Sequence, residues 1–288
     1  MSSDFNEHSI TDAVLDRFAA TPDPRLRRIM QSLVRHAHDF VRDVGLTEEE
    51  WLAAIMFLTR TGHMSDDRRQ EFILLSDTLG ISMLVDAINH RQPAGATETT
   101  VLGPFYTQNP PVLPPGADIS SGLEGTPLFV TGSVTAADGT VLAGAAVDVW
   151  QADDDGFYDV QKPGDDPQLR ARFIADEDGR FRLWTLVPKY YPIPFDGPVG
   201  DMLTATKRHP YRPAHIHFMI SRPGYETLVT HLFVDGDPYL DSDAVFGVKQ
   251  SLIVQLTDEN GAAPGRDLIG GWKSIDHHFG LKPAKAAV

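Results

Sequence analysis

Residues 212–220, which read R-P-A-H-I-H-F-M-I, decide how the second half of this chain folds. Side chains alternate between the two faces of a strand, so His215 and His217 share one face and the apolar residues after them share the other. Two imidazoles about 6–7 Å apart along a strand can hold one metal ion. A solvated strand face carrying the same pair is the alternative. The stretch therefore predicts a strand with one face in a core and a histidine face available to a metal.

The 288-residue chain contains no cysteine and has a formal net charge of −15 at pH 7. The absence of cysteine excludes disulfides, zinc–thiolate sites, iron–sulfur clusters and thiol nucleophiles, so a metal would need His, Tyr, Asp or Glu ligands. Strong negative charge repels nucleic acid and anionic membranes, so we expect neither as a partner. No apolar run approaches the roughly 18 residues that cross a bilayer, and no signal-peptide pattern opens the sequence. We expect a cytoplasmic protein without membrane insertion.

The N-terminal part of the chain has helical periodicity. Apolar residues recur at three- and four-residue spacing over residues 24–44, 48–61 and 65–89, which predicts three helices. Gly45 and Gly62 follow the first two and are expected to end them. The apolar stripes are wider than one neighbouring helix needs. A helical-bundle core explains this width, and a dimer or lipid-binding surface is the alternative.

After Arg91 the composition changes to proline, glycine and threonine, which predicts a domain boundary. From Leu128 onward, short runs rich in β-branched and aromatic residues alternate with turn signals, with no helix-length periodic run between them. This pattern is typical of an antiparallel β-sandwich. We therefore predict an α+β protein that is mainly β, with a helical N-terminal domain over residues 1–105 and a β-sandwich domain over residues 106–288.

Two loops in the β region combine tyrosine with residues that restrict the backbone. Residues 150–159 read W-Q-A-D-D-D-G-F-Y-D, and residues 186–198 read L-V-P-K-Y-Y-P-I-P-F-D-G-P. Tyrosine ionises near pH ~10 and is normally a neutral structural group, but a nearby highly charged cation favours the phenolate. Hard cations prefer anionic oxygen, and ferric iron accepts tyrosine as a ligand. The loops therefore offer further ligands to a metal held by the histidine pair.

Together these motifs resemble those of the intradiol ring-cleavage dioxygenases. The patterns W-x-A-x(3)-G-x-Y, P-x-x-Y-x-x-P and R-P-A-H-I-H occur in the order and spacing of that family, and the resemblance covers nearly the whole chain. Within the family, the stretches T-E-T-T-V-L-G-P-F-Y and D-P-Y-L-D-S-D-A-V-F-G-V-K are most similar to the hydroxyquinol 1,2-dioxygenase subgroup.

The resemblance implies a non-haem Fe(III) centre that cleaves an aromatic ring between two hydroxylated carbons with O2. Hydroxyquinol, a benzene triol, is the implied substrate, and catechol or a chlorocatechol is the alternative. The family's ferric ligands fall on Tyr158, Tyr191, His215 and His217, and Tyr191 would also act as a base.

Further site residues follow from the same resemblance. Arg212 falls on the active-site arginine of the family, and His231 falls where the family often has glutamine beside the iron, which is a departure from the pattern. Histidine can also donate a hydrogen bond, but unlike glutamine it titrates. The implied substrate-binding wall consists of Leu74, Asp77, Thr78, Gly103, Pro104, Phe105, Ile193 and Val245.

The resemblance also implies that the β-sandwich is catalytic, that the N-terminal helices join two copies into a homodimer, and that a phospholipid lies between these helices. Two other interpretations remain open from the residues alone. A non-catalytic binding module on a transthyretin-like or immunoglobulin-like sandwich explains the β pattern but not four spaced ligands. A zinc hydrolase explains the histidine pair, but it would take a carboxylate or a third histidine and has no use for two loop tyrosines.

Overall fold

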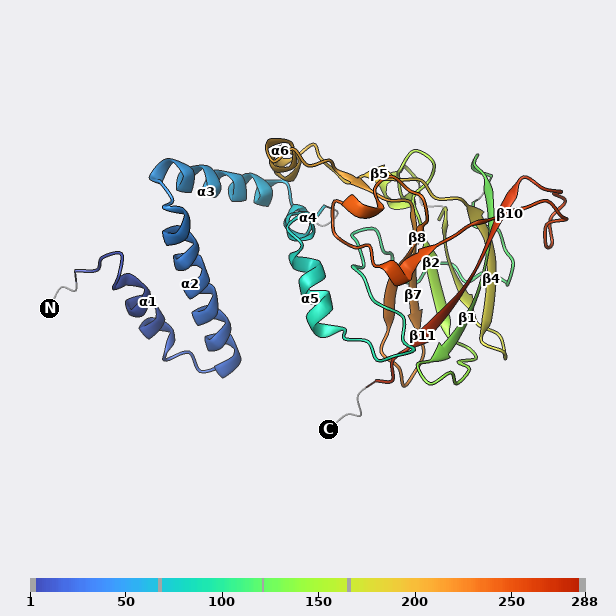
Figure 1. Ribbon diagram of the computed structural model, residues 1–288, viewed down its shortest axis with the longest axis horizontal. Helices are drawn as coiled ribbons and strands as arrows, with labels where there is room; N and C mark the ends of the chain where they lie inside the picture. The colour runs from blue at the N-terminus through green and yellow to red at the C-terminus, as the bar shows by residue number, and fades with distance from the viewer. Residues whose placement is uncertain (1–3, 67–68, 121, 165–166, 285–288) are drawn as a thin grey trace. The chain divides into compact units, whose positions relative to one another are not determined.

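The computed structural model describes residues 4–66, 69–120, 122–164 and 167–284, and Figure 1 shows the order of its elements. The chain divides into two compact units, Met1–Arg60 and Thr61–Val288. The domain boundary between residues 105 and 106 that we expect from composition stays a prediction.

The N-terminal helices are α1 (Ile10–Phe18), α2 (Pro24–Val44) and α3 (Glu48–His63). The start of α2 is fixed by Asp23, whose side chain accepts hydrogen bonds from two backbone N–H groups of the first turn at 2.7 and 3.2 Å. Gly45 ends this helix in the left-handed region, with φ of 59°. The predicted limits of α2 are therefore confirmed, whereas α1 was not foreseen.

The prediction of a single helix over residues 65–89 is wrong. Among the residues of this range that the structure describes there are two helices, α4 (Glu71–Thr78) and α5 (Ile81–Asn89). Gly80 separates them in the left-handed region with φ of 72°, and its N–H donates to the Asp77 carbonyl at 3.0 Å. Glycine alone adopts this conformation without steric cost, so the chain turns where apolar periodicity continues. The break ends α4 directly after Asp77 and Thr78.

The apolar faces of the N-terminal helices do not form a buried core, so the bundle interpretation is wrong for this chain. No residue of α1 or α2 is buried, and α3 buries Thr61. Within the described residues, no helix is long and apolar enough to cross a membrane. The exposed apolar side chains of α2, α3 and α5 include Leu26, Ile29, Leu33, Phe40, Val41, Val44, Trp51, Leu52, Ile55, Met56, Leu84, Val85 and Ile88.

Within the described residues, the β region forms two sheets with orders β3-β2-β7-β8-β9 and β10-β11-β1-β4, and a separate β5-β6 ladder. The predicted fold class, helices followed by a β-rich sandwich, is confirmed. The strands are β1 Pro127–Ala136, β2 Ala146–Trp150, β3 Arg170–Ile174, β4 Arg180–Leu186, β5 Tyr191–Pro192, β6 Tyr211–Arg212, β7 His215–Ser221, β8 Leu228–Val234, β9 Ile253–Val254, β10 Thr257–Glu259 and β11 Trp272–Leu281.

The core lies between the two sheets and includes the apolar face of β7. Ile216, Phe218 and Ile220 are buried in it, as their alternation with the histidines predicts. The Phe218 ring lies 4.9 Å from that of Phe279 on β11 and 6.3 Å from that of Phe181 on β4, measured between ring centroids. Burying a side chain of this size contributes about 1.5–3 kcal/mol. This packing fixes the direction in which the opposite face of β7 presents His215 and His217.

Some of the sandwich departs from the expected pattern. Strand β11 pairs with β1 in parallel, and β8 pairs with β9 in parallel, while the remaining ladders are antiparallel. Strand β11 was not foreseen because its buried residues do not follow period-two alternation: they are Trp272, Ile275, Phe279, Gly280 and Leu281. Helix α6 (Pro198–Ala205) was also missed, since its eight residues follow a proline-rich loop and carry no periodic signal.

Candidate metal centre

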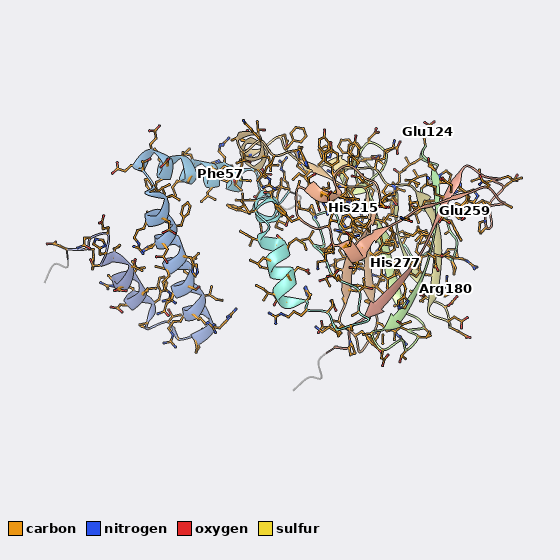
Figure 2. All side chains as sticks on the ribbon, in the orientation of Figure 1. Phe57, Glu124, Arg180, His215, Glu259 and His277 are labelled. Carbon is orange, nitrogen blue, oxygen red and sulfur yellow. The ribbon has the colours of Figure 1, made fainter. Side chains whose placement is uncertain are left out.

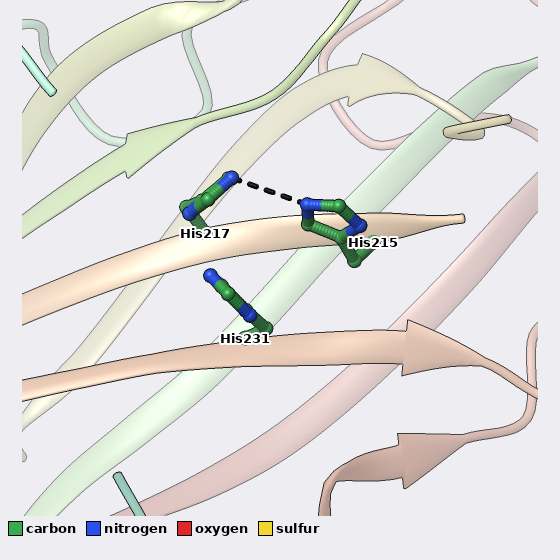
Figure 3. A group of neighbouring side chains, drawn as sticks. All are labelled: His215, His217 and His231. Atoms are coloured by element: carbon green, nitrogen blue, oxygen red, sulfur yellow. Dashed lines mark hydrogen bonds between the residues drawn. The ribbon is translucent and has the colours of Figure 1, made fainter. Parts of the chain in front are cut away.

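Three histidines meet on neighbouring strands of the five-stranded sheet. His215 and His217 lie on β7, and His231 on β8 faces His217 in the strand register (Figure 3). All three are at most 2% exposed. The Nε2 atoms of His215 and His217 are 3.2 Å apart. One ring nitrogen from each of the three histidines can be chosen so that all three nitrogens lie within 4.8 Å of one another. In Figure 2, His215 lies among the strands of the sandwich. The alternative of a solvated strand face is therefore excluded for this pair.

Two loops bring phenol oxygens to the same place. Tyr158 Oη lies 2.8 Å from His217 Nε2 and 2.9 Å from Tyr191 Oη, and both tyrosines are buried. Tyr191 opens β5, where it pairs with Arg212 of β6. Gly156, with φ of 85°, stands two residues before Tyr158, and a Cβ on it would lie 2.6 Å from the Tyr191 Cβ. The glycine of the first motif is thus needed for the two tyrosines to approach.

Contacts behind the rings orient the histidine nitrogens. His215 Nδ1 lies 2.7 Å from the Pro213 carbonyl, which only accepts, so this nitrogen is the donor and Nε2 presents its lone pair to the cluster. The His217 ring stacks on Trp150 with centroids 4.6 Å apart and an interplanar angle of 17°. Thr100 Oγ1 lies 2.8 Å from His231 Nδ1, whereas His231 Nε2 is buried without a hydrogen-bond partner. Each ring is therefore held by a different neighbour.

Burial keeps the cluster uncharged. Desolvation lowers the pKa of His215, His217 and His231 well below the ordinary histidine value, and the Arg212 charge acts in the same direction on all three. Neighbouring imidazoles lower the pKa of His217 and His231 further. Desolvation likewise raises the pKa of Tyr158 and Tyr191 above the ordinary value. Neutral imidazoles are competent metal ligands, and a bound cation reverses the penalty on a phenolate. The nitrogen and oxygen donors, with the unpartnered His231 Nε2, fit a metal ion.

Arg212 is a cation in direct contact with this cluster. It is 4% exposed, donates from Nη1 to His215 Nε2 at 3.2 Å, and pairs through Nε with Asp243 Oδ1 at 3.2 Å. Burial works against its charge, but Asp243 and Tyr191 outweigh burial and raise the pKa of the guanidinium above its ordinary value. The sequence pattern did not single out Asp243, although it lies in the D-S-D-A-V-F stretch.

A cavity of about 950 Å³ is lined in part by Phe105, whose ring stacks on that of Tyr158. Its lining includes Leu74, Asp77, Pro104 and Phe105. Gly103 adjoins the histidine cluster, because a Cβ there would lie 3.4 Å from His217 Cε1. The structure packs Leu74 with Ile193 and Val245 in one apolar cluster, whereas the Thr78 hydroxyl donates back to the Leu74 carbonyl of its own helix at 3.0 Å.

Asp77 is 6% exposed in this wall. Burial raises the pKa of its carboxyl group above the ordinary value, against a hydrogen bond from Ser82 and the attraction of Arg212. Helix α4 is held at both ends. Arg208 donates to the Thr78 carbonyl at 2.6 Å and to the Ala244 carbonyl at 3.1 Å, and the buried Glu71 accepts from the backbone N–H of Val199 on α6 at 3.2 Å. These contacts fix where the Asp77 carboxyl group lies.

Two family descriptions match the chain. The family described as Dioxygenase matches residues 101–279, and Catechol dioxygenase N terminus matches residues 23–97. With a β-sandwich that buries two histidines and two tyrosines beside a cavity, this chain belongs to the intradiol ring-cleavage dioxygenases. It is an enzyme of a family that uses non-haem iron, and the family's substrates are aromatic diols and O2.

Three relatives narrow the comparison within the family. The 6-chlorohydroxyquinol 1,2-dioxygenase of Cupriavidus pinatubonensis is 57% identical over 88% of this chain and 94% of its own length. The hydroxyquinol 1,2-dioxygenase of a Rhizobium species is 50% identical over 96% of both chains. The crystal structure of hydroxyquinol 1,2-dioxygenase from Pseudomonas putida DLL-E4 superimposes with a TM-score of 0.92 at 52% identity, covering 96% of this chain and 99% of that one.

The buried neutral histidines predict how the metal-free protein responds to acid. Each is uncharged when folded but binds a proton below pH ~6.5 when unfolded, so stability falls as pH falls, by up to about 1.4 kcal/mol per pH unit and per histidine. Substituting His231→Gln removes one such group. Between pH 7 and pH 5.5 the free energy of unfolding of the variant should decrease by about 1 kcal/mol less than that of the unsubstituted protein. Urea unfolding of chelator-treated protein measures this difference, and equal losses in the two proteins would contradict the burial of a neutral His231.

Proposed function

We propose that this protein is an Fe(III)-dependent dioxygenase that cleaves hydroxyquinol between its two adjacent hydroxylated carbons. The product would be 3-hydroxy-cis,cis-muconate, a tautomer of maleylacetate. The proposal rests on the convergence of two phenol oxygens and two imidazole nitrogens, in the order Tyr191, Tyr158, His217 and His215, with 2.8–3.2 Å between each atom and the next. Relatives named for hydroxyquinol or 6-chlorohydroxyquinol support the substrate class. Catechol and the chlorocatechols remain the second candidates.

The donor set favours ferric iron over zinc. His231 does supply the third histidine that a zinc site could use. Two tyrosine oxygens nevertheless stand at the same centre, and hard anionic oxygen suits Fe(III). We assign Tyr158, Tyr191, His215 and His217 as ligands, and His231 as a neighbour that presents Nε2 to the site. Bound ferric iron would supply the chemistry that makes the coordinated diol reactive toward O2.

The side chains of the chain then have separate tasks. Tyr191 would take up a proton from a diol hydroxyl at its Oη atom, as a general base. Arg212 would stabilise negative charge that develops on the ring, because a buried guanidinium keeps its charge and needs no reorganisation. Asp243 supports this task by pairing with Arg212 at 3.2 Å. The cavity wall would hold the ring of the substrate against these groups.

Asp77 would distinguish a triol from a diol. It is a buried carboxyl group in the apolar wall that also contains Leu74, and it lies within electrostatic reach of Arg212. Asp77 already accepts a hydrogen bond from Ser82, so a third ring hydroxyl gives the carboxyl group a second donor, whereas catechol leaves it with the Ser82 bond alone. A buried polar atom left without a partner costs about 1–3 kcal/mol. A site that bonds a hydroxyl therefore discriminates strongly against the analogue that lacks it.

The ligand assignment predicts the colour and metal content of the enzyme. Donation from phenolate to Fe(III) should make the purified protein red to burgundy, and an anaerobic diol should change the colour. Tyr158→Ala and His215→Ala should lose iron, whereas Tyr191→Phe should keep iron and bind the diol more slowly, because a displaceable base is missing. Tyr239→Phe, in a separate aromatic cluster with Tyr190 and Tyr211, serves as the matched control. Elemental analysis that found zinc in a colourless protein would overturn the assignment.

The substrate assignment is tested by the ratio of catalytic efficiencies. The enzyme should prefer hydroxyquinol to catechol in kcat/KM, measured by oxygen uptake. Asp77→Ala should lower kcat/KM for hydroxyquinol about tenfold or more, since a hydrogen bond worth about 1.4 kcal/mol corresponds to a factor of ten. Catechol turnover should change less. Asp77→Asn keeps an acceptor oxygen and should retain part of the preference. If Asp77→Ala lowered both efficiencies by one factor, the role of this residue would be structural.

We propose in addition that the N-terminal helices join two copies of the chain and that a phospholipid lies between them. The apolar faces of α2 and α3 support this, because side chains such as Leu33 and Trp51 are 59% and 55% exposed in a single chain. Exposed apolar area of this kind marks an interaction surface. The resemblance to the family supports a homodimer in particular.

The dimer proposal is tested by light scattering at micromolar concentration. The unsubstituted protein should have the mass of two chains, and Leu33→Glu should shift the equilibrium toward one chain by placing a charge in the apolar face. Ile269→Glu, at a side chain that is 81% exposed outside the helices, is the control and should leave the mass unchanged. A monomeric unsubstituted protein would refute the dimer. Lipid extraction followed by mass spectrometry tests the phospholipid separately.

A further inference from the structure

A second buried arginine lies beside the cluster, and the motifs give no signal for it. Arg170 begins β3 and is 4% exposed. It donates from Nε to Asp159 Oδ2 at 2.8 Å and from Nη2 to Asp159 Oδ1 at 2.6 Å, and the same Nη2 donates to the Phe105 carbonyl at 2.8 Å. A buried arginine that makes this many hydrogen bonds fixes the positions of the groups that accept them.

Both partners of Arg170 adjoin Tyr158. Asp159 follows Tyr158 in the chain and opens the short helical turn η1 (Asp159–Gln161) that Tyr158 caps. The backbone N–H of Tyr158 donates to Gln161 Oε1 at 2.9 Å, which ties the residue to this turn. Because Arg170 holds the Asp159 carboxylate with two donors, it fixes the start of the turn and the backbone from which the Tyr158 side chain projects.

The second partner controls the ring of Tyr158. Phe105 stacks on the Tyr158 ring with centroids 4.5 Å apart and an interplanar angle of 25°. The bond from Arg170 to the Phe105 carbonyl links this stacking residue to the turn on the other side. One guanidinium therefore holds two segments that are more than fifty positions apart in the chain and that both contact Tyr158.

We propose that Arg170 is a positioning residue for Tyr158, and that through Asp159 and Phe105 it sets where Tyr158 Oη lies relative to His217 Nε2. The inference rests on the proposed function, since the ligand role of Tyr158 belongs to that proposal. The task suits arginine because its planar fork holds a carboxylate with two donors and still reaches a third acceptor. Lysine keeps the charge but not this geometry.

The same strand supplies a matched control. Arg172 lies two residues further along β3, so its side chain leaves the same face. It also holds a buried carboxylate with two donors, at 2.5 and 2.8 Å from the oxygens of Asp148. Asp148 belongs to β2 and is not a sequence neighbour of Tyr158. Arg172→Lys therefore removes the same kind of bond from the same strand without touching the turn of Tyr158.

The experiment compares Arg170→Lys, Asp159→Asn and Arg172→Lys by iron affinity and visible absorption. Iron affinity is measured by competition with a chelator, and the absorption band of the phenolate–iron bond is recorded in the iron-loaded proteins. Loss of a partner that orients a metal ligand typically lowers metal affinity about 10–100-fold. We expect a decrease of this size, with a shifted or weakened band, in Arg170→Lys and Asp159→Asn. Arg172→Lys should keep the affinity and band of the unsubstituted protein.

The outcomes separate this inference from the proposed function. If the unsubstituted protein bound no iron, the proposed function would fail first. If it bound iron and Arg170→Lys and Asp159→Asn kept both affinity and band, only the role of Arg170 would be refuted. An equal loss in Arg172→Lys would also refute it, because any buried ion pair of β3 would then have the same effect. Thermal unfolding of the metal-free proteins shows whether each variant is folded. If Arg170→Lys and Asp159→Asn were both misfolded while Arg172→Lys was folded, the ion pair would be needed for the stability of the fold, and the positioning role would be refuted.

Discussion

The contact between Tyr158 Oη and His217 Nε2, at 2.8 Å inside the protein, is the constraint on which the rest of the site depends. Burial disfavours the charged form of every ligand candidate, so the metal-free cluster is held neutral. Polar groups in such a place are stable only when they are bonded to one another or to an ion. The sandwich supplies the rigidity, since the Phe218 side of β7 is fixed in the core while the histidine side faces the loops. A metal ion is the partner that satisfies all these donors together.

Part of this site could be predicted from the sequence because it depends on the alternation of side chains along a single strand. Alternation along one strand places His215 and His217 together, and the apolar residues between them indicate which face is the core. The approach of Tyr158 to Tyr191 and His217 could not be derived in this way, because those contacts span 33 and 59 positions of the chain. Resemblance to a family supplied the tyrosines, but Arg170 carried no motif and emerged only from the folded structure.

The errors in the fold have equally specific causes. Apolar periodicity continues through Gly80, yet this glycine adopts a left-handed conformation and divides α4 from α5. Strand β11 pairs in parallel with β1 and buries residues at irregular intervals, so period-two alternation does not reveal it. The wide apolar stripes fit a bundle core in the sequence, because a stripe shows that its side chains need a partner and not which chain provides it. The helix division matters for function, because it makes Asp77 the second-last residue of α4.

The central claim is that this site directs both atoms of O2 to the bond between the hydroxylated carbons of a benzene triol. Mass spectrometry of the product formed from hydroxyquinol under isotopically labelled O2 tests it most directly. The account predicts a ring-opened dicarboxylate that carries one labelled oxygen in each new carboxyl group. An aldehyde-containing product, which would place the cleavage outside the diol, or a product without label would contradict it.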